Sequence, residues 1–250
     1  MSTASILVAD IPPLTRPESL ATAATEYARY LELLRSLPPD AWAHQTECAS
    51  WTVRDMASHV LGAAESIASI RETLHQIRAA ARRDPNRVDA VNAVQVDERV
   101  SLSPDQILES LDSASGASVR ARRRLPALVR RIRVTADLPY GPERWPLAYL
   151  MDVIYTRDTW MHRVDTARST GSSLTLTPEH DGRIVANVVA DWAGRHKSPF
   201  DLTLTGPACG RYRAGDLDGE RHELDAVEFC RRLSGRGPRS QDLLGTLTPF

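Results

Sequence analysis

The sequence predicts a mainly helical α+β protein in which a four-helix bundle precedes a small α/β domain. Apolar residues recur at helical spacing along residues 1–171, and a hydrophobic content of 42% is sufficient for a globular core. Gly171 is a residue type that commonly follows the end of a helix. Beyond it, short alternating runs and turn residues replace the helical periodicity, so residues 172–250 are predicted to form the second domain.

The first two helices of the bundle are predicted over residues 17–36 and from Ser50 or Thr52 to just before Pro85. The apolar positions of the first helix alternate by four and three residues, a spacing typical of bundle seams: Leu20, Ala24, Tyr27, Leu31 and Leu34. Thr52 and Asp55 resemble a capping box with Asp in place of Glu, which favours a helix start at this point.

A polar stretch, residues 84–102, is predicted to be irregular and to lead into the third helix. Ser103 at the cap and Pro104 in the first turn start that helix. It is predicted to run to about residue 124, or to continue beyond a kink at Pro126.

The chain after the third helix is predicted to form a loop over residues 134–145 and then the fourth helix from Pro146 to Gly171. The second domain is predicted to contain a helix capped by Thr177, strands over residues 200–204 and around Tyr212, and a final helix over residues 224–233.

Charge and composition exclude several classes of protein. A net charge of −1 gives no general attraction to nucleic acid or to a membrane, and the arginine run in residues 120–133 has no interleaved aromatic residue. No segment is long and apolar enough to span a bilayer, and residues 1–10 lack the features of a secretory signal. The three cysteines are far apart and odd in number, so we expect reduced thiols and a cytoplasmic protein.

The fourth predicted helix has ionisable residues on its core-facing stripe. The stripe is aliphatic in the first half of the helix, and helical spacing then brings Asp158 and His162 onto it. These two residues are four apart, so both side chains lie on one face, one turn from each other. His59 lies near the apolar stripe of the second helix and would face them if the two helices pack together. Buried charges are normally paired, hydrogen-bonded or bound to a metal ion.

Spacing alone leaves two interpretations of these residues open. Asp158 and His162 form either an ion pair within the helix or two ligands of a divalent metal ion. His59 is either a hydrogen-bonded core histidine or the third ligand. Asp165 either hydrogen-bonds a ligating histidine from outside the coordination sphere or forms a salt bridge with Arg168 or Arg163 at the helix end. Asp55, four residues before His59, is either a ligand itself or, as we expect, acts in the first turn of the helix as a cap or against the helix dipole and supports the ligands from outside the coordination sphere.

Two segments of the chain carry a family resemblance: Cys48–Asp55 followed by His59, and Asp158–Asp165, which reads carboxylate, three residues, histidine, two residues, aspartate. They resemble the two signatures of the mycothiol-dependent maleylpyruvate isomerase family, part of the wider DinB-like metal-dependent superfamily. Residues 229–236 and the terminal Pro-Phe are also similar, so the resemblance extends over nearly the whole chain.

The resemblance implies a DinB-like four-helix bundle that holds a divalent metal ion, usually zinc, between two histidines and a carboxylate. The matching positions are His59, His162 and Asp158, where the family typically has the longer Glu in place of Asp158. It further implies an actinobacterial enzyme that uses mycothiol as cosubstrate and acts on a small electrophile. Arg236, in a Ser-Gly-Arg motif, is the residue that we expect to bind a carboxylate of the substrate.

Two functions from different classes follow from these observations. The first is a metal-dependent enzyme, an isomerase or a thiol S-transferase, in which a metal-bound thiol acts as the nucleophile. The second is a non-catalytic helical binding or regulatory module that retains the DinB-like fold. An open coordination position facing a cavity would distinguish the enzyme. We expect the partners to be a small-molecule thiol and an electrophile, with no nucleic acid or membrane, and the protein to be a monomer or homodimer.

Overall fold

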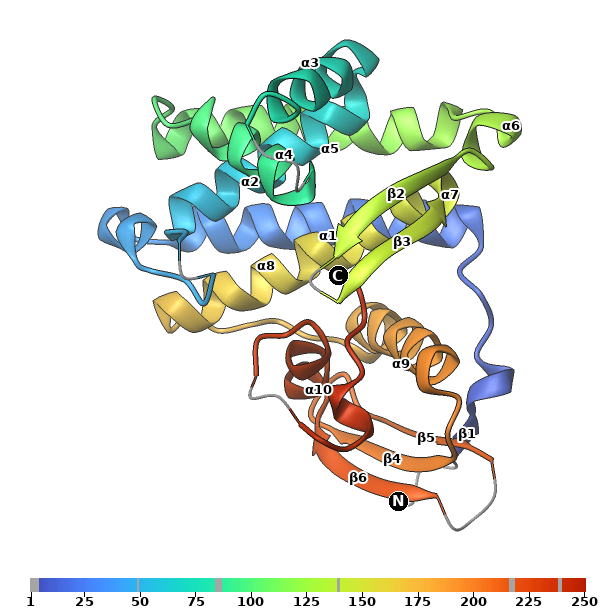
Figure 1. Ribbon diagram of the computed structural model, residues 1–250. Coiled ribbons are helices and arrows are strands. Elements are labelled where there is room, and N and C mark those ends of the chain that lie inside the picture. The colour runs from blue at the N-terminus through green and yellow to red at the C-terminus, as the bar shows by residue number, and fades with distance from the viewer. Residues whose placement is uncertain (1–4, 49, 84–86, 139, 216–218, 238–239) are drawn as a thin grey trace. The chain divides into compact units, whose positions relative to one another are not determined.

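The structure is a computed structural model, drawn as a ribbon in Figure 1. It describes residues 5–48, 50–83, 87–138, 140–215, 219–237 and 240–250. The predicted fold class is confirmed, because the described residues are mainly helical and include a small sheet. No helix among them is both long and apolar enough to cross a membrane.

Contacts divide the chain into two units. The larger unit is Arg16–Leu174, and the smaller unit combines Met1–Thr15 with Thr175–Phe250. The first fifteen residues therefore group with the C-terminal part of the chain. Whether the two parts fold independently, with a border near Gly171, stays a prediction.

Four long helices form the bundle of the larger unit: α1 (Arg16–Ser36), α2 (Val53–Ala68), α5 (Pro104–Arg124) and α8 (Tyr155–Thr170). α1 packs against α5 and α8, and α2 packs against the same two helices (Figure 1). The predicted seam of α1 is buried in its second half, where Tyr27, Leu31 and Leu34 join one core cluster with other bundle helices. In its first half Leu20 is half-buried and Ala24 is exposed. A short 3-10 helix, Pro39–Ala43, follows α1.

Local capping determines where these helices begin and end. The Thr52 hydroxyl accepts a hydrogen bond from the Asp55 N–H, and the Asp55 carboxylate accepts one from the Thr52 N–H at 2.9 Å, which confirms the predicted capping box. Ser103 and Gln106 form the same arrangement at the start of α5. α8 ends at Gly171, whose φ of 68° lies in the left-handed region that glycine adopts without steric cost.

The predicted second helix is divided in the structure. α2 ends at Ala68, and the side chain of Ser69 caps a separate helix, α3 (Ile70–Ala80). The prediction of an irregular stretch over residues 84–102 is wrong over Arg87–Asp97, which forms α4, while residues 84–86 lie outside the described part of the chain. Alanine and valine side chains pack α4 against α3, and such short apolar contacts give a weak periodic signal in the sequence.

A β-hairpin lies where the sequence predicts a loop. The elements of this region are α6 (Ala127–Arg130), β2 (Arg133–Leu138), β3 (Gly141–Pro146), α7 (Leu147–Tyr149) and a π-helical turn, η3 (Leu150–Ile154). β2 and β3 pair antiparallel, from the pair Arg133–Pro146 to the pair Leu138–Gly141. Residue 139 lies outside the described residues. α7, η3 and α8 follow one another directly, so the predicted fourth helix is present but contains a π-helical turn just before the candidate ligands.

The smaller unit is a four-stranded sheet with two main helices. Its elements are β1 (Ile6–Leu7), η1 (Val8–Asp10), η4 (Pro178–Gly182), α9 (Arg183–His196), β4 (Phe200–Thr205), β5 (Gly210–Ala214), β6 (Glu220–Asp225), α10 (Ala226–Leu233) and η5 (Leu243–Gly245). The strand order is β1-β5-β4-β6, with β4 antiparallel to β5 and parallel to β6. Trp192 of α9 lies at the centre, with ring centroids 4.7 Å from Phe200 and 5.4 Å from Phe229.

The strands predicted at residues 200–204 and around Tyr212 are confirmed, as is the cap at Thr177. β1 and β6 are additional strands. β6 includes Leu224 and Asp225, the first two residues of the predicted final helix, which begins instead at Ala226.

Candidate metal centre

The two packed helices α2 and α8 bring His59, Asp158 and His162 together. His59 Nε2 lies 3.3 Å from Asp158 Oδ2, and His162 Nε2 lies 3.2 Å from Asp158 Oδ1. The two imidazole rings are 5.0 Å apart and nearly perpendicular, with Asp158 contacting both. The three side chains predicted to meet therefore do meet, and their role as metal ligands stays a prediction.

The sequence positions these groups through ordinary helix packing. His59 lies in the second turn of α2, which the Thr52–Asp55 capping box starts. Thr166 of α8 contacts the sulfur of Met56 on α2 at 3.6 Å, so the two helices approach closely beside the histidines. Asp158 and His162 then share one face of α8 because they are separated by four residues.

The centre is buried but not closed on all sides. The side chains of His59 and His162 are only 6% and 5% exposed, whereas that of Asp158 is 23% exposed. Burial alone raises the pKa of Asp158, but the charges of His162 and His59 and hydrogen bonds to both rings outweigh it, so the pKa lies well below its ordinary value. Asp158 therefore stays a carboxylate at neutral pH, the form that binds a cation.

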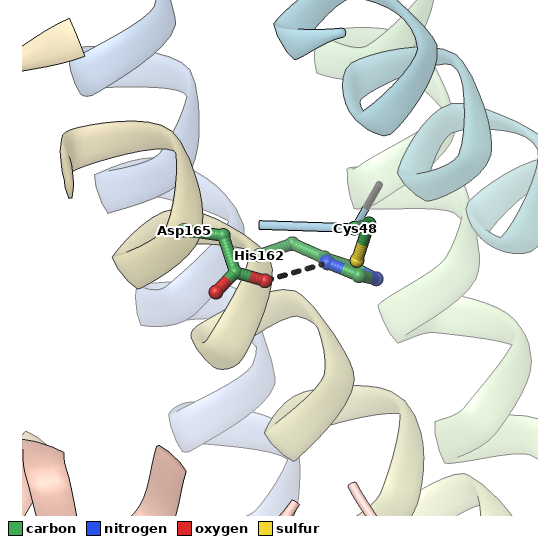
Figure 2. A group of neighbouring side chains, drawn as sticks. All are labelled: Cys48, His162 and Asp165. Carbon is green, nitrogen blue, oxygen red and sulfur yellow. Dashed lines mark ion pairs between the residues drawn. The ribbon is translucent and has the colours of Figure 1, made fainter. Parts of the chain in front are cut away.

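Asp165 supports His162 from the opposite side of the ring. Its Oδ2 lies 3.5 Å from His162 Nδ1, and its carboxylate is fully buried (Figure 2). His162 therefore faces a carboxylate from each of its two ring nitrogens, Asp158 at Nε2 and Asp165 at Nδ1. The alternative partners that the sequence suggested for Asp165 have acidic partners of their own, since Arg163 pairs with Glu26 and Arg168 with Glu47.

Cys48 lies against the same histidine. Its sulfur, a nitrogen of His162 and an oxygen of Asp165 lie within 4.8 Å of one another, and Figure 2 shows the thiol beside the imidazole ring. Cys48 is half-buried, and its carbonyl accepts hydrogen bonds from Trp51 and Thr46 in the turn before α2. The sequence allows two roles for Cys48, a position near the site because it closely precedes the second helix, or a small buried apolar residue; the structure brings its thiol against His162.

Trp51 covers both histidines, and sequence reasoning gave it no role. Its ring centroid is 4.9 Å from that of His59 and 5.9 Å from that of His162. Trp51 is half-buried and immediately precedes the helix cap at Thr52. The only signal in the sequence is that position, one residue before a cap in the same segment as Cys48.

Tyr30 of α1 is a second buried polar group near the centre. Its hydroxyl lies 3.4 Å from the Thr166 hydroxyl. Burial, with smaller effects from the negative charges of Asp165 and Asp158, raises the pKa of Tyr30 well above its ordinary value. Tyr30 therefore remains a neutral phenol that can donate or accept a hydrogen bond.

The two remaining predicted residues have structural contacts of their own. Asp55 forms the capping box with Thr52, and a further role in supporting His59 stays a prediction. Arg236 lies in the smaller unit just after α10, where its backbone N–H donates to the Arg231 carbonyl at 2.9 Å. Its part in substrate binding also stays a prediction.

The donor atoms suit a divalent cation of zinc's size. Zinc bonds to nitrogen and oxygen are about 2.0–2.2 Å long, so two atoms bound to one tetrahedral ion lie roughly 3.4 Å apart. The separations of 3.2 and 3.3 Å between Asp158 oxygens and the two Nε2 atoms are close to this value. Two imidazoles and one carboxylate form a donor set of the borderline softness that zinc prefers.

Known proteins resemble this chain in sequence and in fold. The crystal structure of the mycothiol-dependent maleylpyruvate isomerase matches with a TM-score of 0.59 at 18% identity, over 93% of this chain and 92% of that chain. The structure of a histidine-to-alanine mutant of that enzyme matches with a TM-score of 0.57 at 17% identity and the same coverage. At such identities the likeness is one of fold, and a comparison with curated proteins gave no match. Residues 23–167, more than half of the chain, match the mycothiol maleylpyruvate isomerase N-terminal domain, and the chain therefore belongs to that family.

Proposed function

We propose that this protein is a metal-dependent enzyme that uses a low-molecular-weight thiol, mycothiol or a close relative, to act on a small electrophile. The observation behind this proposal is the group of His59, Asp158 and His162, with donor atoms 3.2 and 3.3 Å apart on two packed helices. Membership of the mycothiol maleylpyruvate isomerase family supports the choice of thiol.

His59, His162 and Asp158 would hold one divalent ion, with zinc as the best match to their chemistry. Three protein ligands leave one position of a tetrahedral ion for a further ligand, as in catalytic zinc sites. A thiol bound there would lose its proton, and so become a nucleophile at neutral pH.

The chain's own residues would prepare that position. Asp165 on His162 Nδ1 orients the imidazole so that Nε2 faces the ion. Trp51 lies over both rings, where it would exclude water from one side of the site. The partial exposure of Asp158 leaves a side from which a thiol could approach.

Isomerase and S-transferase activities would differ in what happens to the carbon–sulfur bond. In an isomerase, the thiolate adds to one carbon of a cis double bond conjugated to a carbonyl, the molecule rotates, and the same carbon–sulfur bond breaks to return the thiol. In a transferase, the bond persists and the thiol is consumed. We favour the isomerase, in keeping with the family, and we propose that Arg236 binds a carboxylate of the substrate.

Metal content and turnover, measured on the same preparations, test the proposal. Wild type, His59→Ala and Asp158→Glu are compared, with His75→Ala as a matched control because His75 is an exposed histidine paired with Glu98. We expect His59→Ala to lose both the ion and thiol-dependent turnover of maleylpyruvate, and Asp158→Glu and His75→Ala to keep both. Measuring free thiol during turnover separates isomerase, which conserves it, from transferase.

The competing function, a non-catalytic helical module, predicts that the protein has no thiol-dependent turnover. If folded His59→Ala retains the metal content of the wild type, His59 is not a ligand. If the metal-loaded wild type shows no thiol-dependent reaction with a panel of electrophiles, the binding module becomes the better description.

A further inference from the structure

A second group of metal-ligating side chains lies wholly within the smaller unit. Glu220, His222 and Asp242 each offer one donor atom, and these atoms lie within 4.8 Å of one another. Glu220 and His222 are two residues apart on β6, so both side chains project from the same face of the sheet. Asp242 immediately precedes the 3-10 turn η5 near the C-terminus.

His222 points a buried nitrogen into this group. Its side chain is only 7% exposed, and among the described residues its Nε2 has no hydrogen-bond partner. Glu220 Oε1 lies 3.3 Å from this nitrogen, but not in hydrogen-bond geometry. An unsatisfied buried nitrogen is costly, so its presence between two carboxylates calls for a further ligand.

The distance between those two atoms matches shared coordination. Atoms bound to one tetrahedral zinc ion lie roughly 3.4 Å apart, close to the 3.3 Å between His222 Nε2 and Glu220 Oε1. Glu220 is 42% exposed, so its side chain has room to adjust toward an ion.

Asp242 is held in position by its neighbours. Its Oδ1 accepts hydrogen bonds from the Ser240 hydroxyl at 2.6 Å and from the Leu244 N–H at 2.9 Å. Ligating carboxylates are commonly fixed by such bonds from outside the coordination sphere. The imidazole is fixed as well, because His222 packs edge-on against Trp192, whose Nε1–H donates to the Leu243 carbonyl at 3.0 Å.

We propose that Glu220, His222 and Asp242 form a second divalent-cation site, selective for a first-row transition ion such as zinc or manganese. One imidazole and two carboxylates combine the ligands that zinc favours with those that manganese favours. The ion would neutralise two carboxylates and satisfy the buried nitrogen of His222. It would also fasten the edge strand β6 to the segment before η5, two parts of the unit with no strand pairing between them.

This site shares no residue with the proposed catalytic centre, so the two can be tested separately. Chelator-treated full-length protein is titrated with Zn²⁺ by calorimetry, in the wild type and in His162→Ala, which lacks a ligand of the first centre. Glu220→Gln is then added to each. Glu220 is at the surface, so this variant leaves the packing around Trp192 intact. Glu223→Gln is the matched control, since it removes a carboxylate from the same strand but from the opposite face.

In the His162→Ala background we expect one Zn²⁺ to bind, Glu220→Gln to weaken that binding by at least about tenfold, and Glu223→Gln to leave it unchanged. Equal affinity with and without Glu220→Gln would overturn the second site, and so would equal losses for Glu220→Gln and Glu223→Gln. If His162→Ala binds as many ions as the wild type, the first centre is wrong instead, while the effect of Glu220→Gln still decides the second.

Discussion

Glu26→Gln is expected to lower the free energy of unfolding of the larger unit by about 3–5 kcal/mol, the cost of removing one partner of a buried ion pair. Glu26 on α1 receives two hydrogen bonds from the guanidinium of Arg163 on α8, at 2.6 and 3.1 Å. The two side chains are 1% and 2% exposed. The amide would remove the charged acceptor of two hydrogen bonds from a buried guanidinium, one residue from His162.

A surface ion pair between α1 and α5 provides the comparison. Asp112 and Arg35 form an ion pair at 2.9 Å with side chains 61% and 53% exposed. Exposed pairs are worth about 0–1 kcal/mol, so Asp112→Asn, the same carboxylate-to-amide change, is expected to have little effect. Replacing both buried partners, Glu26→Leu with Arg163→Met, is expected to recover most of the loss, because apolar side chains then replace both members of the ion pair.

Urea denaturation and thermal melting followed by circular dichroism measure these differences. A loss of 3–5 kcal/mol corresponds to a fall in melting temperature of roughly 6–20 °C for a unit of this size. If Glu26→Gln is no more destabilising than Asp112→Asn, the buried pair does not anchor α8 as we infer. If the double variant is as unstable as Glu26→Gln, uncompensated charge is not the cause of the loss.

Three further predictions concern the cap, the carboxylate and the border between the units. Thr52→Ala removes one half of the capping box and should cost about 1 kcal/mol in urea denaturation, with Ser36→Ala at the end of α1 as a near-neutral control. Because the histidines hold the pKa of Asp158 below its ordinary value, its contribution to stability is present above the unfolded-state pKa of about 3.9 and is lost as the pH falls through the lower folded-state value. The stability difference between metal-free wild type and Asp158→Asn should therefore shrink only in strong acid, and a difference already lost at pH 5 would contradict the assignment. Limited proteolysis should cut within residues 171–178, between the two units, and a stable fragment ending inside α8 would contradict the bundle.

The sequence predicts the bundle and the three clustered side chains because both depend on helical periodicity. Asp158 and His162 share a face of any helix that contains them, and His59 follows the apolar stripe of a helix with a recognisable cap. Trp51 and Cys48 reach the same centre from an irregular turn, held by hydrogen bonds among its own backbone groups. No periodic pattern encodes such a turn, so the sequence indicates only that Cys48 closely precedes the second helix and gives Trp51 no role.

The missed strands have a related explanation. β6 reads Glu-Arg-His-Glu-Leu-Asp, with polar residues on both faces, and an edge strand of that kind lacks the apolar alternation used to recognise strands. The β2–β3 hairpin lies in a segment rich in proline and glycine, residues that indicate a loop more strongly than a strand. In both cases backbone pairing, not side-chain pattern, determines the element.

His59 and Asp158 are separated by 99 positions in the chain, although their side chains lie 3.3 Å apart. An ion held by both would act as a removable cross-link that closes a long loop of the unfolded chain. The entropic cost of closing such a loop grows with the logarithm of its length. In the folded bundle the loop is already closed, so an ion that binds there does not have to overcome this cost. Binding would therefore be confined to the folded state, and a free ion at a hundred times its dissociation constant would add about 2.7 kcal/mol to the free energy of unfolding. The free energy of unfolding of the bundle would then depend on the concentration of free metal ion in its surroundings.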